Sequence, residues 1–183
     1  MFDPQKVTQM AAYFLQKRGG RMSYLKLMKL LYLSDREAMS QFGESISDDQ
    51  AVSMPHGPVL SQTLDLINGD SSAAAWNAWI AGEANYEVSL KVNINREALD
   101  ELSDADLQIM DVIWARCGRM TRFQIRDYTH EHCPEWQDPN GSSFPISAAS
   151  IFKAVGKTEE QAQELTRQLI ARRHLNSVIR NLK

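Results

Sequence analysis

The segment from Ser23 to Gly43, SYLKLMKLLYLSDREAMSQFG, constrains the fold more than any other part of the chain. Apolar residues recur at helical spacing on nearly every side of it, and only Lys26 and Lys29 interrupt its first half. A helix that is hydrophobic all round belongs in the centre of a domain, covered by other helices. We therefore predict a buried central helix with Ser23 as its N-cap and Gly43 as its end. We expect its two lysines to reach solvent or a carboxylate partner.

Length and composition indicate one ordinary globular domain. The chain has 183 residues, of which 43% are hydrophobic and 23% charged, and its net charge is -3. This charge argues against a general attraction to nucleic acid. No apolar run approaches the roughly 20 residues needed to cross a bilayer, and the N-terminus lacks the apolar core of a signal peptide. With only Cys117 and Cys133, we expect a cytoplasmic protein with reduced thiols.

Helical patterns dominate the rest of the sequence. Asp3 followed by Pro4 is typical of a helix start, and Thr121 with Gln124 has the form of a capping box. A second capping box, Thr158 with Gln161, opens a helix that runs toward the C-terminus. Further helices are predicted over residues 4–18, 58–67, 72–81, 104–117, 122–133 and 146–155, with a loop over residues 134–145.

Strand signals are few. Apolar and polar residues alternate from Tyr86 to Val92, and residues 51–54 are predicted as the partner strand because one strand is not stable alone. The fold class that follows is mainly α with a small β-hairpin or two-stranded sheet, a compact α+β domain around a buried central helix. We expect residues 1–156 to form this domain. Residues 157–183 are expected to form an amphipathic basic helix packed on it or extending it.

The motif Met54-Pro55-His56-Gly57-Pro58-Val59 is predicted to be a rigid corner before a helix that begins at Pro58. Its free N–H groups could accept an anion. A purely structural corner is the favoured interpretation, because no second ionisable group is placed beside the histidine.

Residues of metal-ligand type are Cys117, His130, His132 and Cys133, and their spacing matches no zinc pattern. Cys133 with either histidine resembles a thiol and base pair only by proximity in sequence, and catalysis needs an orienting third group. The usual nucleotide, hydrolase and metalloprotease motifs are absent from the sequence. We therefore expect no catalytic residues, no metal and no cofactor.

Two basic clusters leave a nucleic-acid interpretation open. The first lies at the junction of the first two predicted helices, and short glycine turns also join the helices of helix–turn–helix units. The second predicted helix is too apolar to lie exposed in a groove, so this interpretation is disfavoured. The first cluster comprises Lys17, Arg18, Arg21, Lys26 and Lys29, and the second, on the predicted C-terminal helix, comprises Arg167, Arg172, Arg173, Arg180 and Lys183.

The C-terminal helix carries an apolar stripe beside two arginines. This stripe either packs on its own domain or enters a groove of a partner chain. A membrane-surface role is disfavoured because the helix has no Trp or Phe anchor. The residues that we expect to contribute to partner recognition are Arg172, Arg173, Leu175, Val178 and Ile179, with Leu182 completing the stripe.

Several segments together resemble a known family. KLMKLLYLSDREAMSQFG followed by ISDDQAVSMPHGPV closely resembles the Panacea antitoxin domain of SocA-type antitoxins, found also in phage-associated proteins. LSDADLQIMDVIWARCGRM and DYTHEHCPEW resemble later segments of the same family, so the likeness covers roughly residues 5–155. Residues 54–59, His130 and Trp136 are then signature positions to which the family assigns no role.

The resemblance implies an antitoxin that neutralises a cognate toxin by direct protein–protein binding. It implies that the toxin is encoded by an adjacent gene, with a role in phage defence, and that no catalytic residues are carried over. It leaves open the alternative of an adaptor that delivers the toxin to a cellular protease. The two basic clusters leave open a second alternative, a nucleic-acid-binding regulator.

Overall fold

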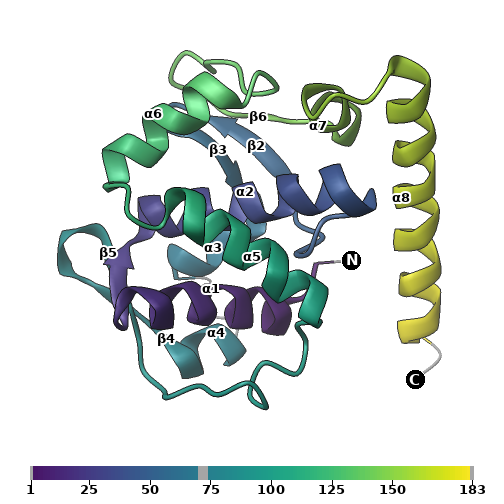
Figure 1. The fold of residues 1–183 in the computed structure, drawn as a ribbon. Coiled ribbons are helices and arrows are strands. Elements are labelled where there is room, and N and C mark those ends of the chain that lie inside the picture. Colours follow the sequence, from purple (N-terminus) through teal and green to yellow (C-terminus); the bar gives the residue numbers. More distant parts are fainter. Residues whose placement is uncertain (1, 70–73, 182–183) are drawn as a thin grey trace.

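The computed structural model describes residues 2–69 and 74–181 (Figure 1). Within these ranges the protein is mainly helical, with two small three-stranded antiparallel sheets, which confirms the predicted fold class. The elements are α1 (Pro4–Arg18), β1 (Arg21–Ser23), α2 (Tyr24–Phe42), β2 (Ala51–Met54), β3 (Gly57–Leu60), α3 (Ser61–Ile67), α4 (Ala74–Trp79), β4 (Ile80–Glu83), the 3-10 turn η1 (Ala84–Tyr86), β5 (Glu87–Leu90), α5 (Asp104–Cys117), α6 (Arg122–His132), β6 (Phe144–Pro145), α7 (Ala148–Ala154) and α8 (Glu159–Asn181).

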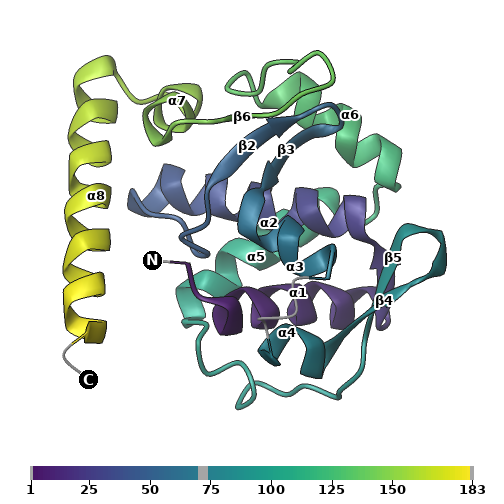
Figure 2. The same cartoon turned by 180° about the vertical axis from the view of Figure 1, so that it is seen from behind.

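Helix α2 lies at the centre of the molecule, as its sequence predicts. Figures 1 and 2 show it between α1 and the β2–β3 hairpin, with α5 across one face. Leu27, Leu30 and Leu31 have no exposed surface. Burying one such side chain contributes about 1.5–3 kcal/mol relative to leaving it in water, so α2 supplies much of the energy that holds the other helices in place.

Local capping fixes where the main helices begin and end. The Asp3 carboxylate accepts a hydrogen bond of 2.9 Å from the Gln5 amide at the start of α1. Ser103 and Thr121 open α5 and α6 with complete capping boxes. Gly43 ends α2 with a φ of 75°, a conformation that glycine adopts without strain. These local signals are the ones that the sequence predicts most directly.

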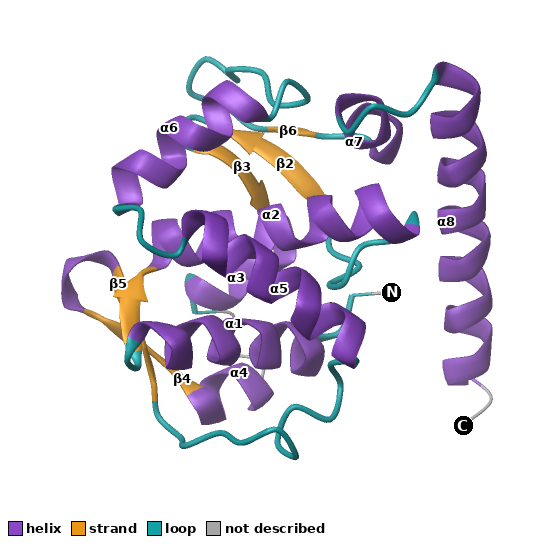
Figure 3. Ribbon diagram, viewed as in Figure 1, coloured by secondary structure: helices purple, strands orange, loops and turns teal. Residues whose placement is uncertain are grey.

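The two sheets lie on different sides of α2 (Figure 3). One has the strand order β1-β5-β4, and the other has the order β3-β2-β6. In the second sheet Val52 pairs with Val59 in a tight hairpin, and Ser53 pairs with Phe144 on the other side. The two strands predicted from the sequence therefore belong to different sheets.

The prediction that residues 51–54 pair with the strand near residue 88 was wrong. Strand β2 pairs with β3 and β6, whereas β5 pairs with β1 and β4. The helix predicted to begin at Pro58 was also wrong, because Gly57–Leu60 is a strand and α3 begins at Ser61. The proline fits here because β3 is an edge strand, where a missing N–H breaks no ladder.

Two other predicted boundaries changed. The predicted start of the helix at residue 72 lies outside the described residues, and its end is at Trp79 instead of residue 81. Ile80 begins strand β4 and pairs with Leu90, so tertiary pairing ends the helix early. The last two residues of the loop predicted over residues 134–145 form strand β6.

Candidate functional site

Helix α8 lies at the edge of the molecule and contacts the rest of the chain along its first half. The Thr158 hydroxyl and the Gln161 amide oxygen form the predicted capping box at its start. Ala162 and Leu169 are buried, and Leu165 approaches the end of α2 so closely that a Cβ at Gly43 would lie 2.9 Å from it. Among the described residues, the apolar side chains that attach α8 to the rest of the protein therefore all lie in its first three turns.

Two ion pairs hold the middle of α8 against the loop that follows α2. Arg172 pairs with Glu44, and Arg173 pairs with Asp48 at 2.9 Å from Nε to Oδ1. A second nitrogen of Arg173 donates to the backbone carbonyl of Asp48 at 3.3 Å. Both predicted partner-binding arginines are thus engaged within the chain, and a partner that uses them has to share or replace these contacts.

The predicted apolar stripe is exposed. Leu175, Val178 and Ile179 expose 58%, 42% and 46% of their surface. At about 100° per residue, they lie roughly 80–180° around the helix from the buried Leu169. Leu175 and Val178 therefore point away from the inner face of α8, whereas Ile179 lies beside that face and lines the groove next to it. Leu182, its fourth predicted member, lies outside the described residues.

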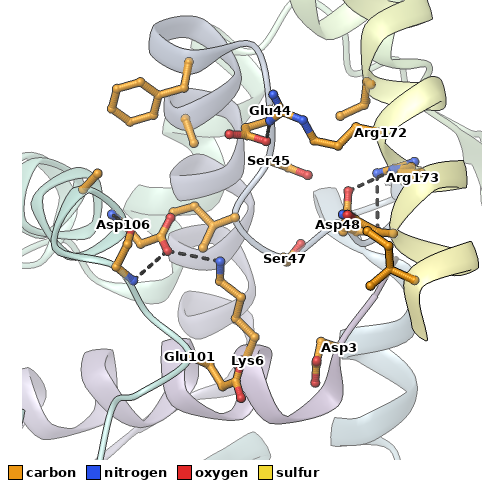
Figure 4. A pocket seen from close by; sticks show the side chains of 18 residues that line it. Asp3, Lys6, Glu44, Ser45, Ser47, Asp48, Glu101, Asp106, Arg172 and Arg173 are labelled. Carbon is orange, nitrogen blue, oxygen red and sulfur yellow. Dashed lines mark hydrogen bonds and ion pairs between the residues drawn. The ribbon is translucent and has the colours of Figure 1, made fainter. Parts of the chain in front are cut away.

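A groove of about 730 Å³ separates α8 from the body of the molecule (Figure 4). Eighteen residues line it, from α8, the end of α2, the 44–48 loop and the starts of α1 and α5. Phe42 and Ile179 are its large exposed apolar side chains. On the wall opposite α8, Lys6 pairs with Asp106 at 3.1 Å. The groove thus combines an apolar surface with charged walls.

The β2–β3 hairpin docks on α2 and α6 through the signature motif. Gly57 has a φ of 93°, and a Cβ there would lie 2.8 Å from the Thr129 hydroxyl and 2.9 Å from the Lys29 amine. The amine of Lys29 has no exposed surface and donates a hydrogen bond of 2.7 Å to the Pro58 carbonyl. Only glycine allows this close approach of the hairpin to α2 and α6.

Trp136 closes the same cluster from the other side. Its indole ring stacks on His130, with ring centroids 4.0 Å apart and planes 3° apart, and its N–H donates to the Met54 carbonyl at 3.0 Å. Pro55 and His56 are exposed at the hairpin tip and do not join the cluster. The remaining signature residue, Val59, packs in the core. The structure therefore brings most of the signature positions together.

A comparison with protein families gives a match that covers more than half of the chain. The family described as "Antitoxin SocA-like, Panacea domain" matches residues 27–137. This chain belongs to the SocA-like Panacea antitoxin family. Searches of curated proteins and of solved structures found no match. Membership confirms the resemblance seen in the sequence and indicates a role in a toxin–antitoxin system, with a toxin as the partner in general.

The Panacea match begins within α2 and ends one residue after Trp136. It therefore contains the hairpin, α6 and the whole cluster around Lys29. Helix α1 lies before it, and strand β6 and helices α7 and α8 lie beyond its end. The predicted partner-binding residues on α8 thus belong to a part of this chain that the family match does not cover.

The expectation that Lys26 and Lys29 reach solvent or a carboxylate was wrong. Lys26 donates to the carbonyls of Gly118 and Met120, both at 2.7 Å, and Lys29 donates to Pro58. Burial lowers the pKa of both amines, and that of Lys29 falls to about 7. Backbone carbonyls leave no trace in a sequence pattern, so these partners were missed.

Two of the buried carboxylates join α2 to other segments through hydrogen-bond networks that sequence patterns did not reveal. Asp35 accepts hydrogen bonds from the amides of Ile46 and Ser47, and from the Ser47 hydroxyl. Glu135 has a side chain without exposed surface and accepts from Tyr32 and from Arg36, the latter at 2.6 Å. These networks join α2 to the 44–48 loop and to the segment after α6. The Asp35 network holds Ile46 and Ser47, which line the groove.

Neither a metal site nor a reactive thiol emerges from this arrangement. Among the described residues, no three side chains of His, Cys, Asp or Glu gather to hold a metal ion. Both cysteines are free and buried, and burial raises the pKa of the Cys133 thiol to about 12. This thiol stays protonated at neutral pH and is a poor nucleophile. An antitoxin family agrees with a non-catalytic role.

Most residues of the first basic cluster are paired with carboxylates or buried within the fold. Lys17 pairs with Asp111 at 2.7 Å, and Arg21 pairs with Glu87 at 2.6 Å. Lys26 and Lys29 are buried. These contacts argue against a phosphate-binding surface at this junction. No helix in residues 2–69 and 74–181 is both long enough and apolar enough to cross a membrane.

Proposed function

We propose that this Panacea protein neutralises a toxin, encoded by an adjacent gene, by binding it directly in the cytoplasm. One observation carries the proposal: the aliphatic stripe of Leu175, Val178 and Ile179 is uncovered on a helix whose first half is anchored to the body. Uncovered aliphatic rows on an amphipathic helix are typical of surfaces that enter a partner's groove. The family supplies the class of partner.

Affinity sets how large the contact has to be. A toxin held at sub-micromolar concentration requires more than about 8 kcal/mol of net binding free energy. Three half-exposed aliphatic side chains contribute roughly 1 kcal/mol each when they are covered, or about 3 kcal/mol together. The stripe therefore orients the partner, and further surface beside it has to be buried in the complex.

Co-expression tests this proposal. The adjacent gene is induced in a bacterial host with and without this protein, and growth is measured. We expect the gene product to arrest growth alone and to be tolerated when both are expressed. A harmless gene product, or arrest that persists with both proteins present, contradicts the proposal.

The choice of host strain distinguishes direct neutralisation from the alternative of a proteolytic adaptor. Direct neutralisation persists in a strain that lacks the relevant cellular protease, and the two purified proteins form a stable complex without it. Rescue that disappears in that strain, with toxin levels rising, instead supports delivery to the protease.

A further inference from the structure

We infer that the groove between α8 and the body receives a short amphipathic helix of the toxin, with its apolar face on Phe42 and Ile179 and a cationic face toward Glu101. This inference rests on the proposed function and goes beyond it, because it names the binding place and the chemistry of the partner segment. The three residues all line the groove, and they come from α2, α8 and the segment before α5.

The apolar part of the argument concerns exposure. Phe42 exposes 53% of its surface at the end of α2, and Ile179 exposes 46% near the end of α8. Two large apolar side chains that are far apart in the sequence thus line the same groove. Leu169 and Ile46 also line the groove and are buried. An occupant with an apolar face would cover Phe42 and Ile179 together.

The charge of the walls selects a cationic occupant. On the α8 side, Glu44 and Asp48 already neutralise the two arginines. The opposite wall belongs to the segment of residues 100–106, DELSDAD, which holds four carboxylates. Asp104 pairs with Arg96 and Asp106 with Lys6. Glu101 is exposed and has no ion pair among the described residues, so its charge is available to a partner.

The backbone of the walls favours a helical occupant. One N–H group at the start of each flanking helix, that of Gln5 in α1 and that of Asp106 in α5, is already bonded to the side chain of Asp3 or Ser103. In the 44–48 loop, the amides of Ile46 and Ser47 are bonded to Asp35. The groove lining contains no residue of the described strands. An occupant therefore has to satisfy its own backbone hydrogen bonds, as a helix does.

The volume limits the length of that helix. One turn with its side chains fills a cylinder of about 10 Å diameter and 5.4 Å height, or roughly 400 Å³. The groove of about 730 Å³ thus holds about two turns. Together with Leu175 and Val178 on the outer side of α8, this contact supplies the additional buried surface that sub-micromolar affinity requires.

The test uses the purified product of the adjacent toxin gene as the probe and isothermal titration calorimetry as the readout. Each groove variant has a matched control outside the groove. Phe42→Ser is compared with Phe123→Ser, because Phe123 exposes a similar 50% on α6. Ala105→Trp, which fills the groove, is compared with Ala115→Trp on the same helix. Both alanines are exposed, so the fold tolerates either tryptophan.

Glu101→Arg is compared with Glu131→Arg, because Glu131 is an exposed carboxylate on α6. We expect Phe42→Ser, Ala105→Trp and Glu101→Arg each to raise the dissociation constant about tenfold. The effect of Glu101→Arg shrinks as salt is added, since the contact is electrostatic. The three control variants bind as the wild type does.

The outcomes separate the inference from the proposed function. If the wild type does not bind the toxin, the proposed function fails. If the wild type binds and the groove variants bind equally well, the proposed function stands and the groove is not the site. Tighter binding by Glu101→Arg overturns the cationic assignment. If sedimentation shows that the groove variants disrupt a dimer of this chain without weakening toxin binding, the occupant is a second copy and the inference is wrong.

Discussion

Lys29 and Pro58 are joined by a hydrogen bond of 2.7 Å from the amine to the carbonyl oxygen, in a place that water does not reach. This contact ties the central helix α2 to the edge strand of the hairpin. An amine buried with a single carbonyl acceptor favours its neutral form, and burial lowers its pKa to about 7 from an ordinary value of 10.5.

The first prediction concerns stability and pH. Between about pH 7 and 10.5 the unfolded chain keeps a proton on Lys29 that the folded protein releases. The contribution of Lys29 to the free energy of unfolding therefore rises with pH across this window and is lowest at and below pH 7. Urea titrations at pH 7 and pH 9 measure the difference. Lys29→Met removes this contribution, whereas Lys153→Met, at an exposed lysine on α7, preserves it.

A second prediction tests the close approach at Gly57. In Gly57→Ala the new Cβ meets Thr129 and Lys29 and also strains a φ of 93°. We expect a loss of about 2–4 kcal/mol in the free energy of unfolding, from strain and overpacking combined. Gly69→Ala is the control, because Gly69 has a φ of 99° with open space around it. Equal losses in the two variants would mean that steric contact contributes nothing at Gly57.

A third prediction concerns the attachment of α8. Arg173→Asp places a second carboxylate beside Asp48, and we expect faster amide hydrogen exchange in the second half of α8. The double variant with Asp48→Arg restores the pair and slows exchange again. A double-mutant cycle should give a coupling of about 0.5–1 kcal/mol, typical of partly exposed ion pairs. Unchanged exchange in the single variant would show that the pair does not hold the helix.

A fourth prediction concerns the exposed stripe. Leu175→Asp with Val178→Asp places charges where both side chains are already exposed, so the melting temperature should not fall. Neutralisation of the toxin in the growth assay should be lost. This pair is a cleaner test than charge reversal at Arg172 and Arg173, because those arginines also hold α8 to the body. Full rescue by the double variant would remove the stripe from the interface.

A fifth prediction concerns the core. Leu31→Asp places a charge at a position with no exposed surface on α2, and we expect the protein not to fold. Circular dichroism and soluble yield measure this outcome. Val112→Asp on α5 is the matched control, because Val112 exposes 42% of its surface and should tolerate the charge. A folded Leu31→Asp protein would contradict the central position of α2.

The parts of this fold that were predictable from sequence are those determined by neighbouring residues. The burial of Leu31 follows from periodicity in α2, and the capping boxes at Thr121 and Thr158 follow from pairs three residues apart. The hairpin was missed because two prolines around Gly57 suggested a corner. Its strand pairing is decided by a close contact with α2 and α6 that local propensity does not encode.

The candidate site was predictable only in part. The exposed side chains of Leu175, Val178 and Ile179 agree with the amphipathic pattern, but the sequence left open whether they pack on their own domain or contact a partner. The partners of Arg172 and Arg173 lie about 125 residues earlier in the chain, so no local pattern indicates them. The groove itself depends on how α8 is placed beside α2 and α5, which is a tertiary property.

The few buried contacts along α8 also bear on how this protein changes over generations. Within the described residues, its fixed points are Ala162, Leu165, Leu169 and three ion pairs, which Glu159, Arg172 and Arg173 make with other parts of the chain. Substitutions elsewhere on the helix leave the packing around α2 untouched and cost little stability. Selection for fit to a new toxin can therefore act on one helix, while selection for folding acts on the rest of the chain.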